Sequence, residues 1–411
     1  MSGVKKIAII THYYNSLNYG GLLQAYALSK VIEELGYDCD VLKTKLSSES
    51  IVNQAKGNFF SREFDNYRYD IKSKGFFRAS VKLFIKLNKN FAEKVFLKIR
   101  KKQILSIKNN VKSRSDALAH FRECKIKHNA QLFSEDNIVE GTANYNIFIC
   151  GSDQVWNPNY TGMFSDIYWL KFVSNEKIKI AYAASAGQEG FLKEHKEELQ
   201  KTLSGYSGVS VREKSLKMSL VRLLPDEQKV EWVLDPTLLM EQDNWRSFCS
   251  PRLIDEEYVF VYFLGDNLQH RKLVKEFAEK QCLKIVALPF VRYCDVNFTD
   301  IDLHDISPER WVSLIKYSKY VFTDSFHGCA FSGIFHTEFY VLKRHKDTSE
   351  LNMNSRIYSL MEIFEASHRV IDDDTPISEI EKIQPINFNI LDKKVELMRK
   401  KSISFLKNAL V

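Results

Sequence analysis

The stretch from Ser307 to Leu342 constrains the fold of this chain more than any other. Ser307 and Pro308 form a helix start, with a hydroxyl N-cap before a proline at the first helical position. An apolar run at 320–323, a polar turn, a helical segment at 329–335 and a second apolar run at 338–342 follow. This alternation predicts a parallel sheet whose strands are joined by crossover helices.

The turn from Asp324 through Ser325 to Gly328 is where we expect chemistry, because ligands of such sheets bind outside the carboxyl ends of the strands. His327 lies in this turn, beside a helix start and a glycine, and its imidazole titrates near neutral pH. The alternative is that His327 only hydrogen-bonds the turn.

The chain begins with a similar unit. An apolar strand at 5–11 leads into a polar loop containing Asn18 and Tyr19, then Gly20 and Gly21 open a helix, and a strand follows at 39–42. The glycines do not form the Gly-x-Gly-x-x-Gly fingerprint, so NAD binding is not supported. A helix start with small residues suits an anion or a sugar hydroxyl, although a tight packing turn explains the glycines equally well.

Two further strands in this half are expected to end in functional side chains. The strand at 145–150 runs into a loop with Ser152, Asp153, Gln154 and Trp156, the outline of a binding loop. Asp153 is its one carboxylate, and a turn or helix-capping role is the alternative.

The strand at 208–211 ends in Arg212 and Glu213, and it follows another strand at 179–184. A guanidinium at this edge can grip a carboxylate or phosphate with two parallel hydrogen bonds. An internal salt bridge from Arg212 to Glu213 or Asp235 is the alternative. The segment 233–239 reads as one more strand and turn.

With 411 residues the chain is too long for one ordinary core, and the pattern restarts after Asp255. Strands at 258–264 and 284–288, with a helix at 269–280, complete a second parallel sheet with those named above. We therefore expect an α/β protein with an N-terminal domain at 1–240, a C-terminal domain at 255–350, and helices in 351–411 that pack back toward the first domain. Arg356 and Asn354 could join the cleft or lie on the surface.

Basic charge is concentrated in an insertion from Lys56 to Lys127, which holds 20 of the 59 Lys and Arg residues but only 6 of the 52 Asp and Glu residues. Phenylalanines recur there at near-helical spacing. Such a helix can lie on an anionic membrane surface, and the alternative is a solvated helical face. Nucleic acid is not an expected partner, because no nucleic-acid-binding motif accompanies the charge.

Seven scattered cysteines without Cys-x-x-Cys spacing argue against a disulfide framework and a zinc site. The apolar run near the start is too short for a signal peptide, and no run approaches the ~20 apolar residues of a membrane helix. We expect a cytoplasmic protein, with peripheral attachment to the inner face of the membrane as a hypothesis.

The motifs together resemble the polysaccharide pyruvyl transferase family. They run in family order from about residue 7 to residue 356. The resemblance rests on Asn18-Tyr19-Gly20-Gly21 with Leu23 to Leu28, Gly151 to Asn157, Ser210-Val211-Arg212-Glu213, Asp235 to Leu239, and Thr323 to Gly328.

This resemblance implies two Rossmann-like domains facing across a cleft in a GT-B-like arrangement. It also implies transfer of pyruvate from phosphoenolpyruvate to a sugar as a cyclic ketal, with His327, Asp153 and Arg212 as catalytic residues and no metal or redox cofactor. Some members carry Arg-Leu-His-Gly where this chain has Ser325-Phe326-His327-Gly328, so an expected anion-binding arginine is missing. Arg344 and Arg356 are the candidates to replace it.

Two other functions fit the same scaffold, since fold alone does not fix function. A glycosyltransferase using a nucleotide sugar is the nearer one, and a non-catalytic glycan-binding protein is the other. The family resemblance implies that the acceptor is a sugar of a polysaccharide or glycan precursor, and it leaves open whether that precursor is lipid-linked.

Overall fold

Two parallel β-sheets organise the protein, each covered by helices. The computed structural model describes residues 5–14, 16–45, 100–188, 190–344, 347 and 353–411. The first sheet has the strand order β2 (Asp38–Val41), β1 (Lys6–Ile10), β5 (Ile147–Cys150), β6 (Ile178–Ala184), β7 (Gly208–Val211) and β8 (Val230–Trp232). The second has the order β10 (Lys284–Ala287), β9 (Tyr258–Tyr262), β11 (Tyr320–Thr323), β12 (Phe339–Leu342) and β13 (Val370–Ile371). A small pair joins β3 (Lys43–Thr44) and β4 (Leu132–Phe133).

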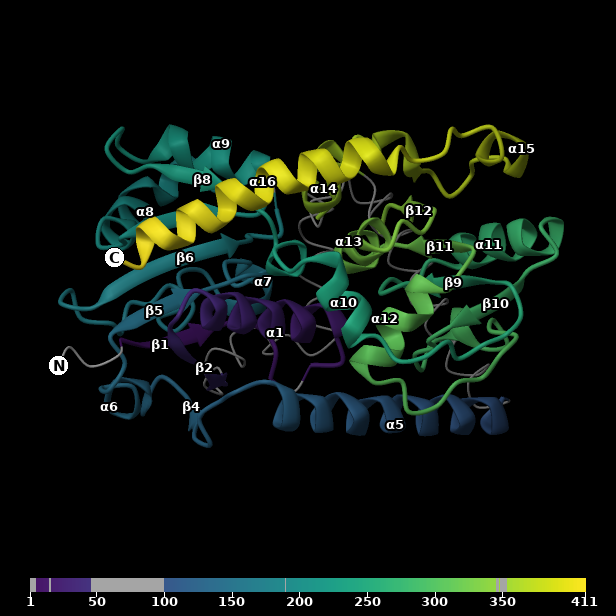
Figure 1. The fold of residues 1–411 in the computed structure, drawn as a ribbon, viewed down its shortest axis with the longest axis horizontal. Helices are drawn as coiled ribbons and strands as arrows, with labels where there is room; N and C mark the ends of the chain where they lie inside the picture. Colours follow the sequence, from purple (N-terminus) through teal and green to yellow (C-terminus); the bar gives the residue numbers. More distant parts are fainter. Residues whose placement is uncertain (1–4, 15, 46–99, 189, 345–346, 348–352) are drawn as a thin grey trace, which may run out of the picture.

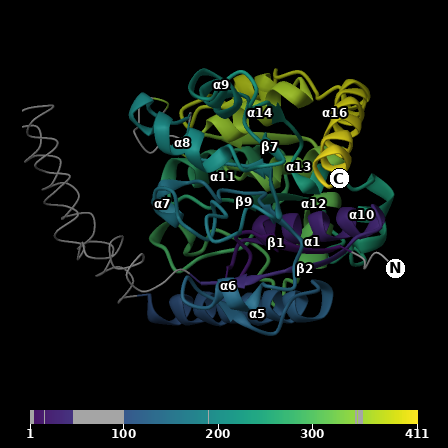
Figure 2. The same ribbon diagram turned by 90° about the vertical axis from the view of Figure 1, so that its left-hand side faces the viewer.

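The sheets lie at opposite ends of an elongated molecule (Figure 1), and Figure 2 views it from the first-sheet end. The helices of the first half are α1 (Tyr19–Glu34), α5 (Lys101–Lys125), α6 (Ile138–Gly141), α7 (Pro158–Thr161), α8 (Lys196–Leu203), α9 (Lys214–Leu223) and α10 (Gln242–Phe248). Those of the second half are α11 (Leu268–Lys280), α12 (Pro308–Lys316), α13 (Phe326–Ile334), α14 (Ser355–Phe364), α15 (Ile377–Ile380) and α16 (Phe388–Ala409). The predicted fold class, two Rossmann-like α/β domains facing across a cleft, is confirmed.

Most strands lie within a residue or two of their predicted positions, because a parallel strand buried on both faces is a continuous apolar run. The segment 233–239, which was predicted as a strand and turn, is the exception. The strand, β8, ends before this segment at Trp232, and Pro236–Leu238 forms a 3-10 helix capped by the Asp235 side chain. Strand β13 extends the second sheet past residue 350, where the sequence had placed the end of that domain.

The two domains share one hydrophobic core at their junction. Tyr19 at the start of α1 stacks on Trp311 of α12 with ring centroids 5.3 Å apart, and its hydroxyl donates to the Ile306 carbonyl. Residues of α1, α12 and α13 belong to the same buried apolar cluster. This contact fixes the start of α1 against the second domain.

Two long helices run along the outside of both domains (Figure 1). Helix α16 lies over the first sheet, where the Ser402 hydroxyl accepts a hydrogen bond from the Leu234 amide. Helix α5 crosses the opposite side. Its Asn110 side chain donates to Asp302 of the second domain, and its Phe121 packs against Tyr26 of α1. The predicted insertion is thus helical at 101–125, and its residues 56–99 lie outside the described part of the chain.

Candidate active site

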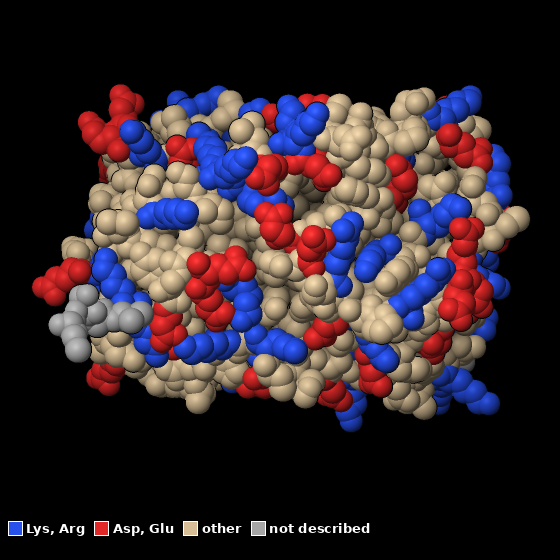
Figure 3. Space-filling model, in the orientation of Figure 1, with Lys and Arg blue, Asp and Glu red and all other residues tan. Residues whose placement is uncertain are grey.

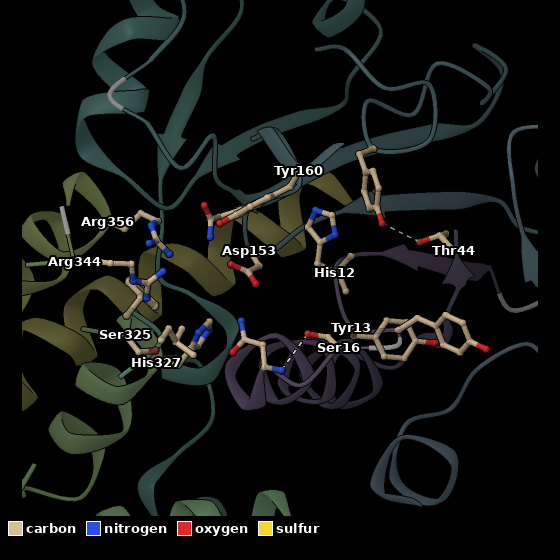
Figure 4. Close-up of a pocket in the computed structure, with 17 residues that line it drawn as sticks. His12, Tyr13, Ser16, Thr44, Asp153, Tyr160, Ser325, His327, Arg344 and Arg356 are labelled. Carbon is tan, nitrogen blue, oxygen red and sulfur yellow. Dashed lines mark hydrogen bonds between the residues drawn. The ribbon is translucent and has the colours of Figure 1, made fainter. Parts of the chain in front are cut away.

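A cavity of about 290 Å³ lies between the two sheets (Figure 4). Its walls come from both domains. The lining residues are Thr11, His12, Tyr13, Tyr14, Ser16, Asn18, Thr44, Asp153, Gln154, Tyr160, Tyr168, Leu264, Ser325, Phe326, His327, Arg344 and Arg356.

The strand orders explain the place of this cavity. In the first sheet the chain goes from β1 to β2 on one side and later to β5 on the other, so the winding reverses between β1 and β5. In the second sheet it reverses between β9 and β11. Ligands of parallel sheets bind beyond the carboxyl ends of strands at such reversals. His12 and Asp153 follow β1 and β5, while Leu264 and Ser325 follow β9 and β11.

Asp153 enters the cavity from the first domain, on a backbone with φ of 68°. Its main-chain carbonyl accepts from the amides of Val155 and Ser185, which holds the loop after β5 against β6. Burial alone would raise the pKa of the Asp153 carboxyl, but the charges of Arg212, His327, His12 and Arg356 lower it below its usual value. Asp153 is therefore an ionised carboxylate facing a cationic wall.

Arg212 does not line the cavity. Its buried guanidinium pairs with three carboxylates, Asp235 at 2.9 Å and Asp153 and Glu213 at 3.3 Å each. The ring of Phe326 covers it, with the centroid 4.2 Å from the guanidinium carbon. The internal salt bridge is thus the arrangement observed, and the guanidinium that we expected to grip substrate instead positions Asp153.

His327 lies in the first turn of α13 rather than in the loop before it. The helix begins at Phe326 because the Ser325 hydroxyl accepts from the Gly328 amide as an N-cap. The imidazole packs on the backbone of α1, where a Cβ added to Gly20 would lie 2.1 Å from its Nδ1 atom. Its Nε2 atom lies 3.6 Å from the Asp235 carboxylate. Glycine at position 20 is thus what allows the histidine of one domain to contact the helix of the other.

Arg344 and Arg356 supply the cationic wall of the cavity, on the side of the second domain (Figure 4). Arg344 is paired with Asp324, at 3.3 Å from each carboxylate oxygen. Arg356 forms no ion pair with a carboxylate of the described residues, and its Nε donates to the Met353 carbonyl. Burial, together with the charges of Arg344 and Arg212, lowers the pKa of Arg356 to about 10. A buried cation that is not in a direct ion pair is suited to an anionic ligand.

The other predicted site residues divide into two groups. Asn18, Gln154 and Ser325 line the cavity, and the Asn18 and Ser325 side chains also cap α1 and α13. The remaining residues shape the site from outside the cavity.

Trp156 was predicted as a substrate contact, but it is a core residue, stacked on Trp169 with ring centroids 4.3 Å apart, and it does not line the cavity. Ser152 donates to the Ala183 carbonyl, with its hydroxyl also 3.0 Å from Asp235. Asp324 accepts from the amides that follow β9 and orients Arg344. Tyr19, Gly20, Glu213 and Gly328 are likewise buried packing residues rather than cavity-lining ones.

Sequence reasoning missed His12 and the tyrosines of the first-domain wall. His12 directly follows an apolar strand and Thr11, the same signal that identified Asp153 and His327. Tyr13 and Tyr14 directly follow His12, whereas Tyr160 and Tyr168 come from a later part of the chain, and no local pattern brings the two pairs together.

A family model described as Polysaccharide pyruvyl transferase matches residues 18–346. No match was found among curated proteins.

Similar solved structures include a UDP-N-acetylglucosamine 2-epimerase from Listeria monocytogenes, with 13% identity, a TM-score of 0.48, and 98% of this chain and 90% of that chain covered. A UDP-GlcNAc 2-epimerase from Methanocaldococcus jannaschii has 13% identity and a TM-score of 0.44, with 96% of this chain and 92% of that chain covered. The spinosyn rhamnosyltransferase SpnG has 9% identity and a TM-score of 0.38, with 98% of this chain and 96% of that chain covered.

Proposed function

Because the chain belongs to the polysaccharide pyruvyl transferase family, we propose that it moves pyruvate from phosphoenolpyruvate onto a sugar as a cyclic ketal and releases phosphate. One observation carries this proposal. Arg344, Arg356 and His327 of the second domain face Asp153 and His12 of the first across one cavity.

The cationic wall suits the donor. Phosphoenolpyruvate carries a carboxylate and a phosphate, and planar guanidinium groups bind either with two parallel hydrogen bonds. Arg356 and Arg344 are our candidates for these contacts, with the amino-terminal end of α13 adding partial positive charge beside Ser325. This assignment replaces Arg212, whose guanidinium is already held by three carboxylates.

The reaction needs a proton on the methylene carbon C3 of the donor, attack of one sugar hydroxyl on C2, departure of phosphate, and attack of a second hydroxyl on the same carbon. His327 is our candidate for the proton donor or for stabilising the departing phosphate. The scheme calls for no metal or redox group, because the donor carries its own leaving group.

We further propose that the acceptor is a sugar of a polysaccharide or of a lipid-linked precursor, met at the cytoplasmic face of the membrane. Tyr160, the most exposed tyrosine of the first-domain wall, is suited to a sugar, since it offers an apolar ring face and a hydroxyl. Among the described helices, none is both long and apolar enough to cross a bilayer.

Phosphate release tests the proposal. The full chain is incubated with phosphoenolpyruvate and a panel of sugar acceptors, and free phosphate is measured. His327→Ala should lower the rate by at least ~100-fold, the typical contribution of a general acid. His368→Ala, an exposed histidine, is the matched control.

Thermal unfolding with each candidate donor separates the alternatives. Stabilisation by phosphoenolpyruvate supports the proposal, because a ligand that binds only the folded state raises the unfolding temperature. Stabilisation by a nucleoside diphosphate alone would point to a nucleotide-sugar glycosyltransferase instead. Normal phosphate release by a folded His327→Ala variant would remove His327 from the mechanism.

A further inference from the structure

We propose that His12 is a further catalytic residue, the base that accepts the proton of the sugar hydroxyl as it attacks the donor. The inference rests on the proposed pyruvyl transfer. In that reaction the first attacking sugar hydroxyl must lose its proton, and no base has been assigned to this step so far. The position of the ring, its hydrogen bonds and its charged neighbours support this role.

The ring of His12 is held in place at the cavity. It follows β1 at the reversal of the first sheet and lines the cavity wall opposite Arg344 and Arg356 (Figure 4). It packs on the ring of Tyr168 with centroids 4.5 Å apart and an angle of 35° between the planes. The Tyr168 hydroxyl is in turn 3.2 Å from the Thr44 hydroxyl. A ring fixed from behind presents its nitrogens in a defined direction.

One ring nitrogen lacks a partner. The Nε2 atom of His12 is buried and has no hydrogen-bond partner among the described residues. A hydrogen bond to the Gln154 backbone raises the pKa of His12, which is the effect of a ring N–H donating to a carbonyl. The bond made by one nitrogen decides which tautomer is present. With its proton on the nitrogen bound to Gln154, a neutral His12 has a free lone pair on Nε2.

The surroundings keep that imidazole neutral until the reaction. Burial lowers the pKa of His12, against the opposing effects of Asp153 and the Gln154 backbone. The other groups that face it are Tyr168, on which it packs, and, across the cavity, His327 and Arg356. A histidine that is neutral at physiological pH can accept a proton, and the nearby Asp153 carboxylate stabilises the imidazolium that forms.

Asp153, which the family resemblance implies to be catalytic, is less suited to the role of the base. The charges of Arg212, His327 and Arg356 lower the pKa of its carboxyl against the effect of burial, so it holds a proton weakly. Its position between His12 and the second-domain cations in Figure 4 fits a fixed negative charge that orients and stabilises His12. Asp153 and His12 then work as a pair.

The proton balance closes without an outside reagent. His327 gives a proton to C3, and the first hydroxyl forms its bond to C2 while its proton moves to His12. That proton leaves with phosphate as the C2–O bond to phosphate breaks, which returns His12 to the neutral form. The second hydroxyl then closes the ketal, and its proton replaces the one that His327 gave. Two hydroxyl protons thus become one on the new methyl group and one on phosphate.

The test compares the full-length wild type with His12→Gln, using phosphate release from phosphoenolpyruvate and the best acceptor of the panel. We expect kcat to fall at least ~100-fold. The affinity for phosphoenolpyruvate, measured by its effect on thermal unfolding, should change less than about twofold. The wild-type rate should fall in acid with a midpoint below pH 6.5, and this acid limb should be missing from His12→Gln. His368→Gln is the matched control.

A second variant keeps the outcome clear if His12→Gln fails to fold. His12→Ala leaves space for a free imidazole, and added imidazole should restore part of its rate. If His12→Gln or His12→Ala turns over normally with an unchanged acid limb, His12 is not the base. If the wild type releases no phosphate with any acceptor, the proposed function fails and this inference falls with it, so the two failures are distinguished by the wild type alone.

Discussion

Gly20 is the residue through which the two domains meet at the cavity. Gly20→Ala would place a methyl group 2.1 Å from the His327 Nδ1 atom, and the backbone of α1 cannot give way easily. We expect phosphate release to fall about tenfold or more, although alanine is favoured over glycine within a helix by ~1 kcal/mol.

The double variant Gly20→Ala with His327→Ala shows whether the effect passes through the histidine. In that background the Gly20 substitution should lower the rate less than in the wild type, because the ring that it displaces is gone and only the contact with the Cβ of residue 327, at 2.6 Å, remains. Equal costs in both backgrounds would mean that Gly20 acts on some other part of the cavity. Phosphate release and urea unfolding of all four proteins complete the cycle.

Arg356 is a residue where binding and stability oppose each other. Its pKa is lowered to about 10 by burial and by the charges of Arg344 and Arg212, so the charged form destabilises the folded protein at every pH below that value. Arg356→Gln should therefore raise the free energy of unfolding, by roughly 1–3 kcal/mol. The same change should weaken phosphoenolpyruvate binding. Urea unfolding and donor-induced thermal shifts measure the two effects, and a loss of stability would contradict the argument.

The buried network around Arg212 joins the ends of three strands in the first sheet. Removing the guanidinium leaves Asp153, Glu213 and Asp235 without their cation, so Arg212→Met should lower the free energy of unfolding by about 3–5 kcal/mol. The difference in free energy of unfolding between the wild type and Arg212→Met should become smaller below about pH 3.9. Arg212 lowers the pKa of Asp153 and Asp235, and the stability gained from these ion pairs is lost as the two carboxylates protonate.

Urea unfolding at pH 7 and in acid measures the contribution of this network. Arg246→Met is a matched control, because Arg246 pairs with Asp243 on the surface and such pairs contribute at most ~1 kcal/mol. If Arg212→Met and Arg246→Met lower the free energy of unfolding equally at pH 7, the buried network does not stabilise the first sheet.

Helix α11 carries a buried histidine that should make the second domain acid-sensitive. His270 packs on Phe263 of the segment after β9, and burial lowers its pKa to about 4. Between pH 6.5 and 4 the unfolded chain binds a proton at this position and the folded chain does not, so stability falls as the pH falls.

From pH 7.5 to pH 5 this single group should remove about 2 kcal/mol of stability. His270→Leu removes the titrating group and should lose correspondingly less stability over the same interval. Urea unfolding at the two pH values tests this, with the exposed His368→Leu as control. Parallel pH profiles for wild type and His270→Leu would show that His270 is not responsible.

The strands could be predicted from the sequence, whereas the partners of the polar residues could not. Continuous apolar runs such as 320–323 identify buried parallel strands, and the residues that follow them identify the edge of the sheet where the cavity lies. The three carboxylates around Arg212 follow three different strands, and Trp156 stacks on a tryptophan of a separate loop. Such pairings depend on the packing of distant segments. The strand-end rule, applied equally to β1, would have found His12.

At the scale of the whole molecule, α5 decides how the protein could meet a membrane. Its apolar stripe, formed by Ile104, Ile107, Leu118 and Phe121, is buried against the two domains and cannot insert into lipid. On the face shown in Figure 3, basic and acidic side chains are intermixed. Attachment to an anionic surface through the insertion would therefore be electrostatic at α5, through exposed residues such as Lys101 and Lys102.

Each basic residue near an anionic surface contributes ~1 kcal/mol, so a few suffice for reversible binding, and salt should weaken it. We predict that the full chain sediments with anionic vesicles and not with neutral ones at low ionic strength. Neutralising Arg100, Lys101 and Lys102, together with Lys98 outside the described residues, should reduce this binding, and raised salt should abolish it. If the intact protein ignores anionic vesicles even at low salt, the basic residues of the insertion are a solvated face, because the apolar stripe of α5 offers no other means of attachment.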